Sequence, residues 1–182
     1  EDPDIVALQE VKYGSYDTIS DSLSNYNCEL SKSVKYNRMY GEMLLIKDNI
    51  EKSEYINFDN SPNIRGMTIY YTNEYVVCTT HLEDVARCND LNTKSILKKF
   101  GCLGDKEFII LGDFNYYQTS KLPYKCVETD YTYVDEKYQS KPDRIFLSDG
   151  WGYEDARVIT NFKEGLSDHY PIVSKIYICN NK

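Results

Sequence analysis

Polar and ionisable residues stand at the ends of several apolar, strand-like runs of this sequence. The run FIILG leads into Asp113 and Asn115, another run leads into His81, and His169 precedes the last one. The chain has only these two histidines. Because a rigid sheet can present strand-end side chains to a ligand, the pattern predicts one shared site. Its predicted members are Glu10, His81, Asp113, Asn115, Asp143, Asp168 and His169.

These residue types suit the hydrolysis of a phosphate ester with the help of a metal ion. Glu10 is a hard oxygen ligand of the kind that Mg²⁺ takes while it keeps waters and accepts phosphate oxygens. Asp113 can orient or deprotonate an attacking water, and the Asn115 amide can donate to a non-bridging phosphate oxygen. This chemistry needs no nucleophilic Ser or Cys beside a histidine.

The two histidines complete the predicted site. A carboxylate beside His169, for which Asp143 is the candidate, would fix the imidazole tautomer and keep the ring protonated to face an anionic transition state. His81 can supply a second hydrogen-bond donor. For either histidine alone, a structural role is an equal alternative, but the acids in matching positions favour a site.

Nine strands are expected to position these residues. The runs are rich in Val, Ile, Tyr and Thr and are separated by Asn, Asp, Gly and Pro, which is typical of short strands. They cover residues 4–10, 41–47, 54–58, 67–72, 75–80, 107–111, 144–147, 156–160 and 171–179.

Two helices are predicted from apolar residues at helical spacing. Tyr16, Ile19, Leu23 and Tyr26 form one face, and a second helix ends at Gly104. The apolar side of the second helix comprises Val85, Cys88, Ile96, Phe100 and Leu103. Many strands with few, separated helices indicate an α+β domain in which helices flank a sheet sandwich.

Composition indicates one domain over residues 1–182. A chain of 182 residues with 41% hydrophobic residues can build one core, and its longest apolar runs are far shorter than the roughly 18 residues that cross a bilayer. The net charge of −8 disfavours binding of long duplex DNA through many phosphate contacts. A small contact footprint on nucleic acid remains compatible with this charge. We expect an intracellular monomer, nuclear or cytoplasmic.

Five motifs carry a resemblance to a known family. DIVALQEV, TTHLE, ILGDFN, PDRIFLS and LSDHYPIV occur in this order and resemble motifs of the endonuclease/exonuclease/phosphatase superfamily. The resemblance implies a DNase I-like fold, which is a four-layer α/β/β/α sandwich. The family's first strand has no counterpart in this sequence, so we expect the N-terminal part of the domain to be incomplete here.

The resemblance also assigns roles. Asp113 and Asn115 match the pair that handles the nucleophilic water and the scissile phosphate, and His81 matches a phosphate-contacting histidine. Asp143 matches the acid that partners the catalytic histidine, His169.

The resemblance further implies a metal cofactor. Glu10 matches the metal-binding glutamate, and Asp168 matches an acid near the metal. The expected ion is Mg²⁺, with Mn²⁺ as an alternative.

Within the superfamily, residues 40–71 resemble the 5′-tyrosyl-DNA phosphodiesterases. Residues 81–100 resemble the helix that follows in that subfamily, and residues 131–133 stand where it has Tyr-Thr-Trp. Together these likenesses imply substrate contacts by Arg65, by the aromatic residues Tyr40 and Tyr133, and by Glu83 of the THLE motif. The expected activity is hydrolysis of phosphate esters at DNA 5′ ends, including 5′-tyrosyl linkages, in DNA repair. The subfamily's GDTNLRD reads GDFNYYQ here, which removes an Arg-Asp pair.

Three alternatives stay open at this point. The chain can be a broader DNase or abasic-site endonuclease, or a phosphoesterase of inositol phosphates or lipids. From a different class, it can be an inactive family member that serves as a binding module.

Overall fold

The computed structural model describes residues 2–30, 40–59, 61–63, 65–115, 122–161 and 166–179. Its helices are the 3-10 helix η1 (Tyr13–Ser15), α1 (Tyr16–Ser22) and α2 (Ala86–Phe100). Its strands are β1 (Ile5–Lys12), β2 (Asn27–Leu30), β3 (Tyr40–Ile46), β4 (Lys52–Asn57), β5 (Gly66–Tyr71), β6 (Tyr75–His81), β7 (Glu107–Asp113), β8 (Lys125–Cys126), β9 (Tyr133–Val134), β10 (Gln139–Ser140), β11 (Asp143–Leu147), β12 (Trp151–Val158) and β13 (Ile172–Ile178).

Six strands form the largest sheet, in the order β4-β5-β6-β7-β11-β8. β6 and β7 are parallel neighbours, and α2 lies between them in the chain as the crossover that a parallel pair requires. Ile96 and Phe100 of α2 share a buried cluster with Ile110 and Phe146 of the sheet. This cluster fixes α2 on one face of the six-stranded sheet.

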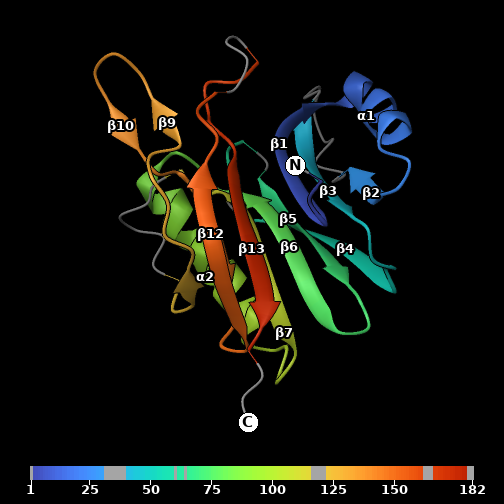
Figure 1. Cartoon of the computed structure of the whole chain (residues 1–182). Coiled ribbons are helices and arrows are strands. Elements are labelled where there is room, and N and C mark those ends of the chain that lie inside the picture. Colours follow the sequence, from blue (N-terminus) through green and yellow to red (C-terminus); the bar gives the residue numbers. More distant parts are fainter. Residues whose placement is uncertain are drawn as a thin grey trace.

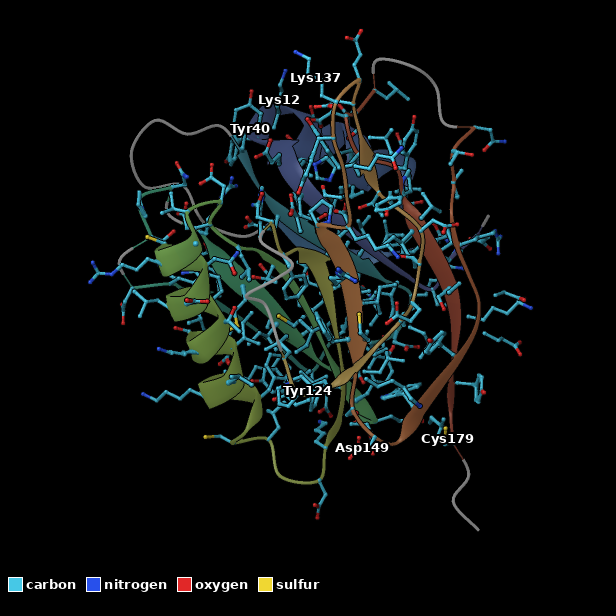
Figure 2. The ribbon with its side chains drawn as sticks, turned by 90° about the vertical axis from the view of Figure 1, so that its left-hand side faces the viewer. Lys12, Tyr40, Tyr124, Lys137, Asp149 and Cys179 are labelled. Atoms are coloured by element: carbon cyan, nitrogen blue, oxygen red, sulfur yellow. The ribbon has the colours of Figure 1, made fainter. Side chains whose placement is uncertain are left out.

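A second sheet layer, made of β1-β3-β2 and β12-β13, covers the opposite face. Alternate residues of β3 point to its two sides. Leu44 packs with Val77 of β6 between the sheet layers, whereas Met43 packs with Ile19 of α1 on the outer side. The layers therefore run α1, sheet, sheet, α2. Figure 1 shows α1 beside β1, β2 and β3, and Figure 2 shows α2 on the outer side of the sheets. The predicted four-layer α/β/β/α sandwich is confirmed.

Every predicted strand and helix is present, with bounds that differ by a few residues. The largest difference is at β12, which begins at Trp151 rather than at residue 156. The strands β2, β8, β9 and β10 were not predicted. Three of these are two-residue pairings, so they are too short to show a hydrophobic period.

The inward face of α2 differs from the predicted one. Ile96 and Phe100 are buried as expected, but Val85 is 53% exposed, so its predicted place on the packed side is wrong. Asn89 and Asn92 are both fully buried instead. Their side chains hydrogen-bond to backbone groups that follow β6 and β7, which explains why a helix buries two amides.

Two sequence-based predictions fall outside this description. That the family's first strand is missing from this sequence stays a prediction, and the departure from the subfamily motif at residues 116–118 lies outside the described residues. Within the part of the chain that the structure describes, no helix is both long and apolar enough to cross a membrane.

Candidate active site

Three predicted site residues form one row across the six-stranded sheet. His81 ends β6 and pairs in register with Asp113, which ends β7. On the other side of β7, Asp113 pairs with Asp143, the first residue of β11. Strand pairing alone thus places an imidazole and two carboxylates next to one another at one end of the sheet.

Gly112 permits the close approach of β6 and β7 beside Asp113. Its φ of +146° is rarely adopted by other residues, and a Cβ at this position would overlap the carbonyl oxygen of Thr80 on β6. The glycine is therefore required to keep Asp113 level with His81.

Replacement of Gly112 should be costly. We expect Gly112→Ala to lower the free energy of unfolding by about 3 kcal/mol, because the added methyl group forces two backbones apart. Urea unfolding of the variant and of Gly14→Ala, where nothing lies within 4 Å of the new Cβ, measures this. Equal midpoints for the two variants would contradict the close approach.

The second sheet layer contributes Glu10 and His169. Glu10 lies where the pairing of β1 with β3 shifts register between Leu8 and Val11, and such a bulge re-aims a side chain. Glu10 and Asn115 have positive φ angles of 55° and 50°. Strained backbone of this kind is frequent at functional sites.

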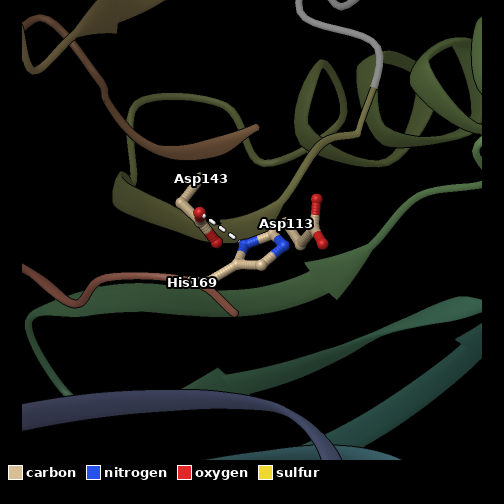
Figure 3. A group of neighbouring side chains, drawn as sticks. All are labelled: Asp113, Asp143 and His169. Carbon is tan, nitrogen blue, oxygen red and sulfur yellow. Dashed lines mark hydrogen bonds and ion pairs between the residues drawn. The ribbon is translucent and has the colours of Figure 1, made fainter. Parts of the chain in front are cut away.

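His169 and Asp143 form a close pair. The Nδ1 of His169 lies 2.8 Å from Oδ2 of Asp143. Burial lowers the pKa of His169, but the hydrogen bond to Asp143 and the charges of Asp143, Asp113 and Asp168 outweigh it and raise the pKa to about 9. The ring is therefore a cation at neutral pH. Figure 3 shows it between the carboxylates of Asp143 and Asp113.

Asp113 is buried at the centre of the site, with 7% of its surface exposed. Burial and the nearby charge of Asp143 raise its pKa to about 6, even though the backbone N–H of Asn115 donates to its Oδ1 at 2.8 Å. A carboxylate with this pKa is a stronger base than an exposed one and is still ionised near neutral pH. The Asn115 side chain donates from Nδ2 to the carbonyl oxygen of Leu82 at 2.7 Å, which fixes the amide in place.

His81 is neutral and has a defined tautomer. Burial and the charge of Arg65 lower its pKa to about 3. The Nη1 of Arg65 lies 2.8 Å from Nδ1 of His81, and a guanidinium can only donate, so Nδ1 accepts and Nε2 carries the proton. This Nε2 lies 3.4 Å from Oδ2 of Asp113. Arg65 also reaches Oε1 of Glu10 at 3.3 Å.

The structure brings some of the predicted substrate residues to the site. The ring of Tyr133 lies 5.3 Å from that of His169, edge to face, and the two residues form a β-bridge. Tyr40 begins β3 opposite Lys12 and is 45% exposed, at the end of the molecule labelled with Lys12 and Tyr40 in Figure 2. Asp168 is exposed next to His169.

Glu83 requires a correction. Glu83 is fully buried, and its carboxylate accepts hydrogen bonds from Ser61 and Asn63. Because both of its oxygens already accept hydrogen bonds from the protein, the predicted substrate-binding role is wrong.

Residues that hold the site together were missed by the sequence analysis. Asn89 of α2 donates from Nδ2 to the carbonyl oxygens of both Glu83 and Phe114, at 2.8 Å each. It thereby ties the segment after His81 to the segment after Asp113. An asparagine on the apolar side of a predicted helix was the available signal.

The ionisable groups of the site differ in how open they are to a metal ion. Ligand atoms of Asp113, Asp143 and His169 all lie within 4.8 Å of one another. However, Nδ1 of His169 is already engaged in the 2.8 Å hydrogen bond to Oδ2 of Asp143. The Glu10 carboxylate, with a side chain 59% exposed, and the exposed Asp168 carboxylate are open to a hydrated ion.

The sequence matches the profile of the Endonuclease/Exonuclease/phosphatase family over residues 1–169. The chain therefore belongs to this family of phosphoester hydrolases, whose members generally use divalent metal ions. The comparison with curated proteins found no match.

Solved structures with a similar fold include two TDP2 proteins and a phosphatase. TDP2 from D. rerio, complexed with single-strand DNA product, is 18% identical with a TM-score of 0.81 over 96% of this chain and 86% of that chain. Truncated TDP2 from Caenorhabditis elegans is 19% identical with a TM-score of 0.76 over 97% and 85%. The mannosyl-6-phosphatase of Bacteroides thetaiotaomicron is 15% identical with a TM-score of 0.74 over 96% and 85%. At these identities the likeness shows a shared fold.

Proposed function

We propose that this chain is a Mg²⁺-dependent phosphodiesterase that hydrolyses phosphate esters at DNA 5′ ends, including 5′-tyrosyl linkages. The observation that carries the proposal is the grouping of a basic Asp113, a protonated His169 and a neutral N–H donor, His81, at one end of the sandwich. The resemblance of residues 40–71 to the 5′-tyrosyl-DNA phosphodiesterases supports the choice of substrate. So does the likeness to a TDP2 complexed with single-strand DNA product.

The roles in this proposal follow from charge and position. Asp113 takes the proton of the attacking water, and the His169 cation, held by Asp143, faces the anionic phosphate. His81 donates its Nε2–H to a phosphate oxygen, and the second amide hydrogen of Asn115 can do the same. A tyrosine leaving group has a pKa of roughly 10, so its departure needs less help from a general acid than that of an alkoxide.

Glu10 and Asp168 would hold the Mg²⁺ ion. Both are exposed carboxylates next to the proton-handling residues, and Mg²⁺ is bound by one or two carboxylates and several waters. When bound, the ion would polarise the phosphate and stabilise the leaving oxygen. Mn²⁺, with similar oxygen ligands, is the alternative.

Tyr133 is the proposed stacking partner for a nucleobase or tyrosyl ring, because it stands beside His169. Tyr40 and Arg65 are the further proposed substrate contacts. We also propose that residues 1–182 act as a single catalytic domain, as a monomer in the nucleus or cytoplasm, in DNA repair. The net charge of −8 fits a short DNA end better than an extended duplex.

The similar fold of a mannosyl-6-phosphatase favours a phosphatase of small substrates as the second candidate. The full-length protein should be assayed with Mg²⁺ on a 5′-tyrosyl oligonucleotide, an abasic duplex and an inositol phosphate. The proposal expects release of tyrosine to be the fastest reaction, and chelation of the metal by EDTA should abolish it. Hydrolysis of the inositol phosphate alone would replace the proposed substrate class with the second candidate.

A further inference from the structure

Glu83 is a fully buried carboxylate that stands two residues after His81. Burial of a carboxylate is costly unless hydrogen bonds compensate for lost water. Its Oε1 accepts from the Ser61 hydroxyl and from the backbone N–H of Asn63 at 2.7 Å, and its Oε2 accepts from Nδ2 of Asn63 at 2.6 Å. The Glu83 carboxylate therefore holds Ser61 and Asn63, which precede β5, in place.

Arg65 follows two residues after Asn63, directly before β5. The Ser61 hydroxyl donates to Glu83 and at the same time accepts from the backbone N–H of Arg65 at 2.8 Å. The carbonyl oxygen of Arg65 accepts from the N–H of Phe58 at 2.9 Å. Both backbone groups of Arg65 are thus fixed, one of them by a hydroxyl that Glu83 orients.

The guanidinium of Arg65 transmits this placement to the site. It donates to Nδ1 of His81, so the proton of that ring stays on Nε2, which is the nitrogen that faces Asp113. Without a donor at Nδ1, a neutral imidazole can carry its proton on either nitrogen. Only the Nε2–H tautomer offers a donor on the side of Asp113.

Glu83 itself is held from α2. Its backbone N–H donates to Oδ1 of Asn92 at 3.0 Å, and its carbonyl oxygen accepts from Asn89 at 2.8 Å. These contacts fix the backbone of Glu83 relative to α2. The network of hydrogen bonds therefore runs from α2 to Glu83, and then through Ser61 and Arg65 to His81.

We propose that Glu83 is a positioning residue that holds Arg65 through Ser61 and so sets the tautomer of His81. The catalytic consequence, a prepared N–H donor for a phosphate oxygen, rests on the proposed function. The tautomer is a property of the folded protein alone, and it can be measured without a substrate.

The test uses the fact that the chain has only two histidines. In ¹⁵N spectra of labelled full-length protein, the wild-type His81 should show one protonated and one unprotonated nitrogen, and His169 should show two protonated nitrogens. In Glu83→Gln, an N–H group replaces an acceptor that faces donors, so Arg65 should shift. The two His81 nitrogens should then move toward a common, tautomer-averaged position while the His169 signals stay unchanged.

Two further variants separate this role from a general loss of folding. Ser61→Ala removes the link between Glu83 and Arg65 but leaves both Asn63 contacts, and it should shift the His81 signals in the same direction. Glu107→Gln is the matched control, because the Glu107 carboxylate also accepts from a serine hydroxyl, that of Ser148, and from a backbone N–H, that of Gly150. It starts β7, whereas the site lies where β7 ends, so its His81 signals should match the wild type.

Kinetics test the consequence for hydrolysis. Glu83→Gln should lower the rate by about 10- to 100-fold, the usual range for residues that orient an active group. Combined with Arg65→Ala, it should add nothing further, because residues that act through one another are not additive. Additive losses, or an unchanged His81 spectrum in Glu83→Gln, would overturn the proposal. A shifted spectrum in a protein that hydrolyses none of the three substrates would uphold the network and overturn the proposed function.

Discussion

Asp113→Asn should lower the rate of phosphoester hydrolysis by about 10²- to 10⁴-fold, the range for loss of a general base. Asparagine keeps the shape of the side chain and the acceptor for the Asn115 N–H, but it cannot take a proton from water. Initial rates at saturating Mg²⁺, measured on whichever substrate the wild type hydrolyses fastest, give the ratio.

The same variant should fold at least as stably as the wild type. Burial raises the pKa of Asp113, which means that its ionised form opposes folding above a pH of about 6. A neutral amide removes that cost. Thermal unfolding at pH 7.5 without metal checks this, and a large drop in the midpoint would mean that lost activity reports lost structure. Retained turnover in a folded Asp113→Asn would remove Asp113 from the mechanism.

Asp143→Asn is expected to have an effect of similar size, about 10³-fold or more. The amide cannot stabilise the imidazolium, and it can hold the ring in the wrong tautomer. The pKa of His169 should fall from about 9 toward its ordinary value of 6.5, which a pH titration of its ¹⁵N signals measures. The pH at which the rate falls on the alkaline side of the pH-rate profile should decrease as this pKa decreases.

The pH dependence of protein stability gives a second test of the pair formed by His169 and Asp143. The folded-state pKa of His169 lies above the unfolded value, so the pair stabilises the protein fully below about pH 6.5, and this contribution is lost as pH rises through about 9. Asp143→Asn should flatten that dependence. Asp155→Asn, which alters an exposed carboxylate paired with Lys175, serves as the control and should leave activity and the His169 titration unchanged. An unaltered His169 pKa in Asp143→Asn would refute the pairing.

The row formed by His81, Asp113 and Asp143 could be predicted from the sequence, because these residues stand at strand ends and within the family motifs. Apolar runs that end at His81 and Asp113 predict two strands, and parallel pairing of these strands sets the two residues side by side. The contact between Asp143 and His169 was proposed from chemistry, since an imidazole that must stay charged needs a carboxylate.

The supporting contacts were not accessible in the same way. Glu83 looks like a strand-end acid in the sequence, and only the packing of the segment before β5 over it shows that it is enclosed. Asn89 and Asn92 are polar residues on the apolar side of α2. A search for apolar residues at helical spacing passes over them, although both are fully buried. Hydrogen bonds between distant segments leave no periodic signal. The strands β8 to β10 were missed for another reason, because two residues are too few to show a period.

The most direct test of the central claim is a single turnover of the full-length protein with Mg²⁺ in ¹⁸O-labelled water. The substrate is a 5′-tyrosyl oligonucleotide. If Asp113 directs water onto the phosphate, the new 5′ phosphate carries one ¹⁸O atom in the first turnover and the released tyrosine carries none. A first-turnover phosphate without ¹⁸O, or no tyrosine release at all, would contradict the account.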